Sequence, residues 1–250
     1  MGEVLTLQSF AGLRVEQPLS KVPTVNILLY GKPGVGKTRL AGTADDVPEM
    51  RKVLFIDVEG GTFTLRKSNP NCDVIRIKTW PELQGLYNEL HRGAHDYRTV
   101  VLDSLTELQK LDMYYILAEL TKGERASGKD IDEDIASVRE WGRSIEHIRK
   151  LVRGFRDLPM NVIFTAHQKE DKDKKGKITI KPSLPGKLAD EVAGFLDVVL
   201  FMYVKNIDGE EARMLLSTAT DEHIAKDRSD SLPQVIQNPT MTSLFELITS

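Results

Sequence analysis

The chain of 250 residues contains a single cysteine, Cys72, which excludes an internal disulfide and a zinc site built on several thiolates. It has no apolar run long enough for a membrane-spanning helix, and its N-terminus lacks a secretory signal pattern. We therefore expect a cytoplasmic protein with no membrane partner. The formal net charge is only −3, so any affinity for nucleic acid is expected to be local.

Short runs rich in β-branched residues alternate with segments of helical periodicity. Strands are expected at residues 26–30, 53–57, 74–77, 99–103, 161–166 and 197–204. Helices are expected at residues 37–44, 80–92, 105–120 and 135–155, the last being the longest. Runs such as ILLY and VLFID are apolar throughout, as in strands that are buried on both faces. The pattern predicts an α/β fold, with a mostly parallel sheet flanked by helices.

The C-terminal part of the chain has a different pattern. The strand expected at 197–204 and a further apolar run at 213–218 are separated by the turn sequence Asn-Ile-Asp-Gly-Glu. This arrangement is typical of a hairpin and predicts an antiparallel extension of the sheet. We expect residues 1–22 to form a polar N-terminal arm and residues 23–250 to form one domain.

A glycine-rich motif follows the first expected strand and precedes the first expected helix. It matches the phosphate-binding pattern GxxxxGK[ST] with Gly31, Lys32, Pro33, Gly34, Val35, Gly36, Lys37 and Thr38. In such a P-loop, backbone N–H groups surround the phosphates of a nucleotide. Lys37 would reach the β- and γ-phosphates, and the Thr38 hydroxyl would ligate Mg²⁺. The motif therefore predicts binding of ATP with Mg²⁺.

Two carboxylates lie at or just beyond the ends of expected strands. Asp103 ends the apolar run TVVLD and is the candidate Mg²⁺ partner of Thr38, although an Asp-Ser pair can also begin a helix. Glu59 lies just beyond the run VLFID, where a carboxylate can polarise an attacking water. A solvated turn, supported by the two glycines that follow, is the alternative for Glu59.

With these motifs, the chain resembles the RecA-like core ATPases, and among them the compact phage-type proteins of the Sak single-strand annealing group. The resemblance runs over most of residues 24–230 and includes GKPGVGKT, FIDVEGG, TVVLDS, VIFTAHQ and PGKLADEVAGFLDVV. It implies that Glu59 activates water and that His167 senses the γ-phosphate. RecA recombinases have glutamine at that sensor position. The resemblance also implies that Lys226 and Arg228 reach into the ATP site of a neighbouring subunit. A polar surface turn is the alternative for this segment.

The segment 168–186 carries six lysines against three acidic residues, and it is expected to form a hairpin. Under the resemblance it occupies the place of a DNA-binding loop. Its candidate phosphate contacts are Lys169, Lys172, Lys174, Lys175, Lys177 and Lys181. The segment has no aromatic residue, so its grip on DNA would be electrostatic. A solvated surface hairpin is the alternative. A first DNA-binding loop is expected at 122–134, with Lys122, Arg125 and Lys129.

Together these features predict an ATPase that forms a homo-oligomer, a ring or a filament, on single-stranded DNA during phage recombination or annealing. Such a protein would act in the host cytoplasm, with a single-strand binding protein as a further partner. Binding or annealing is expected rather than strand exchange. The alternatives are a ring-forming helicase-like motor, a small-molecule P-loop kinase and a non-catalytic DNA-binding module.

Overall fold

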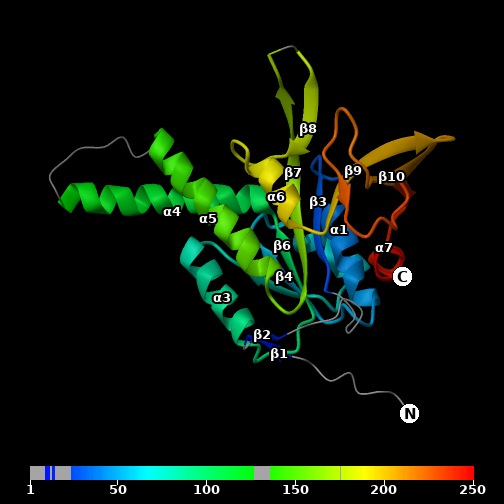
Figure 1. The fold of residues 1–250 in the computed structure, drawn as a ribbon, viewed down its shortest axis with the longest axis horizontal. Helices are drawn as coiled ribbons and strands as arrows, with labels where there is room; N and C mark the ends of the chain where they lie inside the picture. The colour runs from blue at the N-terminus through cyan, green and yellow to red at the C-terminus, as the bar shows by residue number, and fades with distance from the viewer. Residues whose placement is uncertain (1–8, 12, 15–23, 127–135, 175) are drawn as a thin grey trace.

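The computed structural model describes residues 9–11, 13–14, 24–126, 136–174 and 176–250. Within them, ten strands form one sheet (Figure 1) with the order β12-β10-β9-β3-β7-β6-β4-β5, to which β8 is added beside β7 and β11 beside β9. The strands are β3 (Asn26–Gly31), β4 (Val53–Asp57), β5 (Asp73–Arg76), β6 (Thr99–Asp103), β7 (Asn161–Lys172), β8 (Ile178–Pro182), β9 (Val198–Ile207), β10 (Glu210–Leu216), β11 (Lys226–Asp227) and β12 (Val235–Gln237). The six strands from β5 to β9 in this order are parallel, whereas β10 pairs antiparallel with β9, and β12 pairs antiparallel with β10. The predicted α/β class with an antiparallel C-terminal extension is confirmed.

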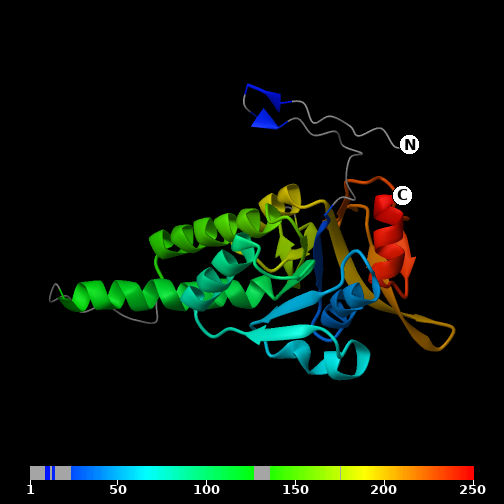
Figure 2. The ribbon, with the colours of Figure 1, turned by 90° about the horizontal axis from the view of Figure 1, so that it is seen from below.

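Helices cover both faces of this sheet. They are α1 (Lys37–Gly42), α2 (Leu65–Ser68), α3 (Trp80–Arg92), α4 (Leu105–Ala126), α5 (Val138–Arg156), α6 (Leu188–Phe195) and α7 (Met241–Thr249), with 3₁₀ turns η1 (Thr43–Asp46) and η2 (Gly61–Thr64). In the expected N-terminal arm, β1 (Ser9–Phe10) and β2 (Leu13–Arg14) form a separate two-stranded hairpin (Figure 2), and the rest of the arm lies outside the described residues. No helix in the described part of the chain is both long and apolar enough to cross a bilayer.

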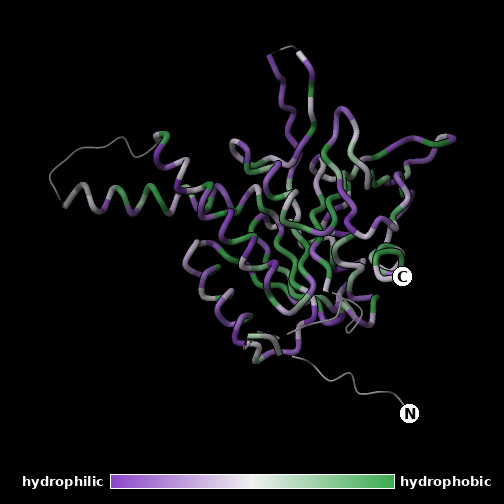
Figure 3. Tube along the Cα trace, in the orientation of Figure 1, coloured by the Kyte–Doolittle hydropathy of each residue, from purple (hydrophilic) through white to green (hydrophobic). Residues whose placement is uncertain are grey.

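The central strands are apolar on both sides because each side faces a core. In β3, Leu28 and Tyr30 belong to the core under α3, α4, α5 and α6. Ile27 and Leu29 belong to the core on the other side, under α1 and α7. Hydrophobic residues are concentrated accordingly in the middle of the molecule (Figure 3). This double burial is the physical reason for the uninterrupted apolar runs.

Capping residues set the helix boundaries, and they change one prediction. The helix α3 has the predicted bounds, with Thr79 in a capping box. The expectation that the segment 135–155 is the longest helix is wrong, because α4 has 22 residues and α5 has 19. Because Ser137 is the N-cap of α5, that helix begins at Val138 and not at residue 135. The helix α4 continues past the predicted end at residue 120, and Lys122 in this part forms an ion pair with Glu119 at 3.0 Å.

The predicted C-terminal hairpin is confirmed, with Ile207 of β9 opposite Glu210 of β10. The turn between them is Asp208-Gly209, and both residues have positive φ, at 53° and 89°. This backbone favours an Asp-Gly pair, because glycine adopts positive φ without strain and aspartate tolerates it better than most residues.

One polar side chain joins three strands at the amino edge of the sheet, the edge where the parallel strands begin. Asn161 starts β7, and its side chain is buried. The Asn161 Oδ1 accepts a hydrogen bond from the Val25 N–H at 3.0 Å, and its Nδ2 donates to the Arg98 carbonyl at 3.1 Å. Val25 precedes β3 and Arg98 precedes β6, so Asn161 connects the starts of three adjacent strands.

We expect Asn161→Ala to lower the free energy of unfolding by about 1–3 kcal/mol, because the buried Val25 N–H would lose its acceptor. The measurement is the midpoint of urea denaturation at an unchanged m-value. The control is Asn88→Ala on the exposed side of α3, which should change stability by less than about 0.5 kcal/mol. Equal midpoints for Asn161→Ala and the parent would contradict this role.

Candidate active site

The phosphate-binding motif lies at the carboxyl edge of the sheet, the edge where the parallel strands end. It connects the last residue of β3, Gly31, to the first residue of α1, Lys37. Gly34 and Gly36 have φ of 78° and 108°, in the left-handed region that favours glycine. At Gly31, an added Cβ would lie 2.2 Å from the Met202 carbonyl oxygen of β9. The loop therefore needs its glycines for its curvature and for the close approach of β9.

The Lys37 ammonium is held at the mouth of this loop. It donates hydrogen bonds to the carbonyl oxygens of Gly31 (3.1 Å) and Lys32 (3.0 Å). Burial lowers the pKa of Lys37, and the nearby carboxylates of Glu59 and Asp103 act in the opposite direction. The arrangement presents a positive charge to an anion bound in the loop.

The predicted metal residues, Thr38 and Asp103, lie in contact. Thr38 Oγ1 donates to Asp103 Oδ2 at 2.7 Å, and Thr165 Oγ1 of β7 donates to Asp103 Oδ1. Burial raises the pKa of Asp103, and the two hydroxyl hydrogen bonds partly offset that effect. Beside them, an added Cβ at Gly61 would lie 3.8 Å from both Asp103 Oδ2 and Thr38 Oγ1.

These oxygen donors fit Mg²⁺. Mg²⁺ prefers oxygen ligands, and in nucleotide sites it is held by one or two protein groups together with phosphate oxygens and water. The described residues contain no group of three or more His, Cys, Asp or Glu side chains that would enclose a metal ion by themselves. The site thus suits a metal ion that arrives with its nucleotide.

The predicted water-activating residue and the predicted sensor also meet. Glu59 follows β4 and His167 lies in β7, yet Glu59 Oε1 is 3.2 Å from His167 Nε2. The Glu59 side chain is 35% exposed and the His167 side chain 18%, so the pair lies at the rim of the site. The carboxylate has a second oxygen, which can accept a hydrogen bond from water.

The loop that carries Glu59 is stabilised by hydrogen bonds to Asp57, a residue that is not among the predicted site residues. Its two oxygens accept hydrogen bonds from the Gly60 N–H (2.7 Å) and from Thr62 Oγ1 (2.6 Å). Arg76 of the edge strand lies 3.5 Å from Asp57 Oδ2. Asp57 and Thr165 share one signal that could have identified them, since each lies near the carboxyl end of a predicted strand.

A cavity of about 280 Å³ adjoins the phosphate loop. Arg213 of β10 lies in its wall, and the buried Arg213 Nε has no hydrogen-bond partner among the residues that the structure describes. That atom would be 2.8 Å from a Cβ at Gly36. The Asn238 backbone and side chain both bond the Arg213 backbone, at 2.7 and 3.1 Å, and Thr240 lies nearby in the lining. The cavity therefore lies between the phosphate loop, β10 and the segment before α7.

The lysine-rich hairpin consists of the outer half of β7 and β8, and it projects from the carboxyl edge (Figure 1). Lys172, Lys174 and Lys177 are exposed. Lys181 is buried and pairs with Asp171.

Lys169 is partly buried and donates to the Leu184 carbonyl. Lys169 and Lys181 therefore support the foot of the hairpin, and their contact with DNA stays a prediction. Lys175 and, in the expected first loop, Lys129 lie outside the described residues, as does the side chain of Arg125, whereas Lys122 is exposed in α4.

Lys226 and Arg228 lie at the opposite, amino edge of the sheet, beside the start of β9. Lys226 Nζ donates to three carbonyl oxygens at the end of α6, at 2.8–3.2 Å. Arg228 Nη1 donates to Asp197 Oδ1 at 2.7 Å. Both cations are thus engaged in contacts within the chain. They lie at the opposite ends of the strands from the chain's own phosphate loop. Their expected action on a neighbouring subunit stays a prediction.

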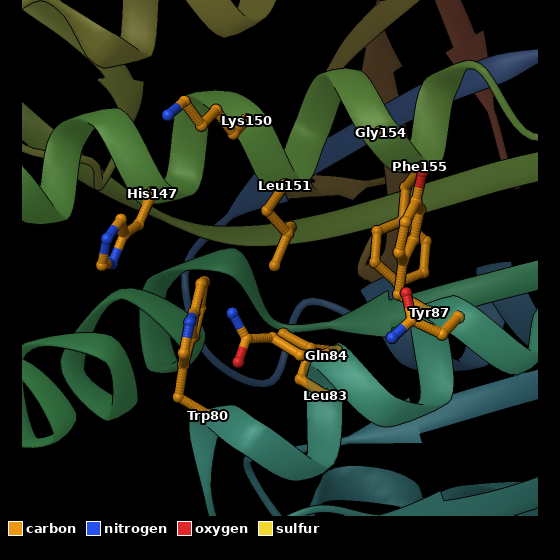
Figure 4. Close-up of a pocket in the computed structure, with 10 residues that line it drawn as sticks. Trp80, Leu83, Gln84, Tyr87, His147, Lys150, Leu151, Gly154 and Phe155 are labelled. Carbon is orange, nitrogen blue, oxygen red and sulfur yellow. The ribbon is translucent and has the colours of Figure 1, made fainter. Parts of the chain in front are cut away.

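A separate groove of about 520 Å³ lies between α3 and α5 (Figure 4). Trp80 stacks on His147 with ring centroids 5.8 Å apart, and His147 Nδ1 is 2.7 Å from the buried carboxylate of Asp112. The groove lies on the face of the sheet opposite α1, and none of the predicted site residues is among the described residues that line it.

The loop between β3 and α1, with Thr38 and Asp103 in contact beside it, defines a P-loop nucleotide-binding domain. A sequence family described as an AAA domain matches residues 24–229. The chain therefore belongs to this AAA domain family.

Solved structures with a related arrangement include a KaiC-like protein from Pyrococcus horikoshii OT3, with 13% identity, a TM-score of 0.42 and 77% of each chain covered. They also include the flagellar accessory protein FlaH from Methanocaldococcus jannaschii, with 10% identity, a TM-score of 0.43 and coverage of 85% of this chain and 84% of that chain. A comparison with curated proteins finds no match.

The arrangement predicts different defects for two substitutions. Lys37→Ala should weaken ATP binding by about 10- to 100-fold, because a charged hydrogen-bond donor to the phosphates is lost. Glu59→Gln should retain ATP binding and lower kcat by at least about 100-fold, because the base is lost while the ground-state contacts remain. Binding of a fluorescent ATP analogue and steady-state phosphate release measure the two effects. Lys67→Ala, at an exposed position of α2, is the control. Parental turnover in Glu59→Gln would remove Glu59 from the reaction.

Proposed function

We propose that this protein is a Mg²⁺-dependent ATPase that assembles on single-stranded DNA and uses ATP to control its affinity for that DNA. The setting we propose is phage-type recombination or single-strand annealing, in the cytoplasm of the host and alongside a single-strand binding protein. The family and the fold support the ATPase part of this proposal, while the DNA part depends on the arrangement of one strand.

That strand is β7, and it carries the proposal. Its inner part contributes His167, which contacts Glu59, and Thr165, which holds Asp103. The same strand continues without a break to Lys172 in the lysine-rich hairpin. A change at the γ-phosphate that moves His167 would therefore be transmitted along a continuous strand to the hairpin.

In the reaction that we propose, Lys37 contacts the β- and γ-phosphates, and Thr38 and Asp103 hold the metal ion. Mg²⁺, when bound, neutralises charge on the phosphates. Glu59 accepts a proton from the water that attacks the γ-phosphate, while His167 holds the Glu59 carboxylate in place. Loss of the γ-phosphate would change the environment of His167.

On the DNA side, the exposed lysines of the hairpin would contact phosphates. Such contacts release counterions from the nucleic acid, so the affinity should fall as salt rises and should depend little on sequence. Asp173 and Glu170 in the same hairpin are exposed and reduce its net charge. A single hairpin would therefore bind DNA weakly, and tight binding would require the hairpins of several subunits to contact one DNA strand.

We expect single-stranded DNA to stimulate ATP hydrolysis, and we expect simultaneous charge reversal of Lys172, Lys174 and Lys177 to abolish the stimulation. Three lost phosphate contacts should also reduce the slope of log K against log salt by about 2. A matched reversal of Lys67, Lys78 and Lys150, which are exposed away from the hairpin, is the control for net charge. An unchanged salt slope in the hairpin variant would show that the hairpin is a solvated surface feature that does not contact DNA. No response of the parent to DNA would refute the DNA function.

We further propose that Lys226 and Arg228 act on the ATP of a neighbouring subunit, which requires a head-to-tail ring or helix. Arg228→Ala and Lys37→Ala should each hydrolyse ATP poorly, and mixing the two should restore part of the activity, because some interfaces then combine an intact loop with an intact Arg228. Phosphate release by mixed and unmixed subunits measures this. Normal hydrolysis by Arg228→Ala with DNA present, or no recovery after demonstrated co-assembly, would contradict action between subunits.

A further inference from the structure

Three aromatic rings gather at the carboxyl edge of the sheet beside the lysine-rich hairpin. Phe201 and Tyr203 lie on the same face of β9, with ring centroids 5.6 Å apart and planes 16° apart. His223 comes from the loop that follows β10, and its ring centroid is 4.4 Å from that of Phe201. We call the space lined by these rings, with Thr220, Asp221 and Glu222 at its rim, the aromatic groove; its volume is about 580 Å³.

The aromatic groove is anchored to the strand that leads into the phosphate loop. Tyr30, the residue before Gly31, packs its ring 5.2 Å from Phe201. The Tyr30 hydroxyl donates to the Ile224 carbonyl at 2.6 Å, and the Ile180 carbonyl lies 3.2 Å away. One side chain thus holds both the loop that carries His223 and the strand β8 of the hairpin.

Further contacts join the aromatic groove to the hairpin. The Ile180 N–H donates to the Glu222 carbonyl at 2.6 Å, and Ile180 forms a parallel bridge with His223. Lys177 Nζ lies 3.6 Å from Asp221 Oδ1. The exposed lysines and the aromatic groove are therefore adjacent parts of one surface, although they are far apart in sequence.

The chemistry of this surface divides in two. Exposed cations on the hairpin favour phosphates. The rings of the groove favour flat, apolar faces, and its carboxylates can accept hydrogen bonds from the amino groups of bases. The same carboxylates repel phosphates. A single nucleic-acid strand has both kinds of group at a short separation, with the bases free to stack.

We propose that the aromatic groove stacks bases of the single-stranded DNA whose phosphates contact the hairpin lysines. This inference rests on the DNA-binding function proposed above and adds a second, non-electrostatic part to it. The ring of Tyr203, which is partly exposed, is the principal stacking surface, and His223 also lines the groove.

The test compares an oligo(dC) strand with an abasic strand of equal length, by fluorescence anisotropy at one salt concentration. The parent should bind oligo(dC) roughly 5- to 100-fold more tightly than the abasic strand. Tyr203→Ala should lose that preference, and Tyr203→Phe should keep it, because phenylalanine retains the ring. Val204→Ala, at the exposed neighbouring position of β9, is the matched control, and thermal melting verifies that each variant folds.

Three outcomes would overturn the inference. If Tyr203→Ala binds oligo(dC) as tightly as the parent, the DNA is held by the lysines alone and only the groove assignment fails. If the parent binds neither strand, the DNA function and the groove fail together. If Tyr203→Ala instead lowers the mass of the assembled protein in the absence of DNA, measured by light scattering, a second copy of the chain covers the groove.

Discussion

The buried carboxylate of Asp103 receives hydrogen bonds from two hydroxyls, and the geometry of the site depends on these contacts. Thr38 comes from the helix after the phosphate loop and Thr165 comes from β7, so the carboxylate connects three segments at the centre of the carboxyl edge. Burial disfavours the charge, as the raised pKa of Asp103 indicates. A cation bound beside Asp103 would therefore stabilise a charge that burial disfavours.

Much of the fold and the core of the site could be predicted because their signals are local. The phosphate loop is one uninterrupted motif, and the strands around Asp103 are apolar throughout because both faces are buried. The contact between Glu59 and His167 could not be derived in that way. It depends on the order of β4, β6 and β7 in the sheet, which brings together residues that are distant in sequence.

The errors and omissions have a similar cause. Nothing in the hairpin sequence distinguishes Lys181, which is buried against Asp171, from the exposed Lys174. Arg213 was not singled out because its partner segment begins two dozen residues later, near Asn238. The helix α4 extends beyond the predicted residue 120 because it continues into a polar, glycine-containing stretch, which has no apolar stripe to predict a helix. In each case, the burial, the partner or the helix end depends on tertiary contacts or on helix propagation, which the local sequence pattern does not show.

The two edges of the sheet differ in the kind of residue that they contain. At the amino edge, Asn161, Asp197 and Lys226 are engaged in hydrogen bonds with neighbouring segments of the same chain. At the carboxyl edge, the strands end in the phosphate loop, the Glu59 loop and the lysine-rich hairpin. The same strands therefore begin at contacts that join segments of the chain and end at the phosphate loop and the residues around it. Such a separation allows a residue of the carboxyl edge to be replaced without loss of the contacts that hold the starts of the strands together.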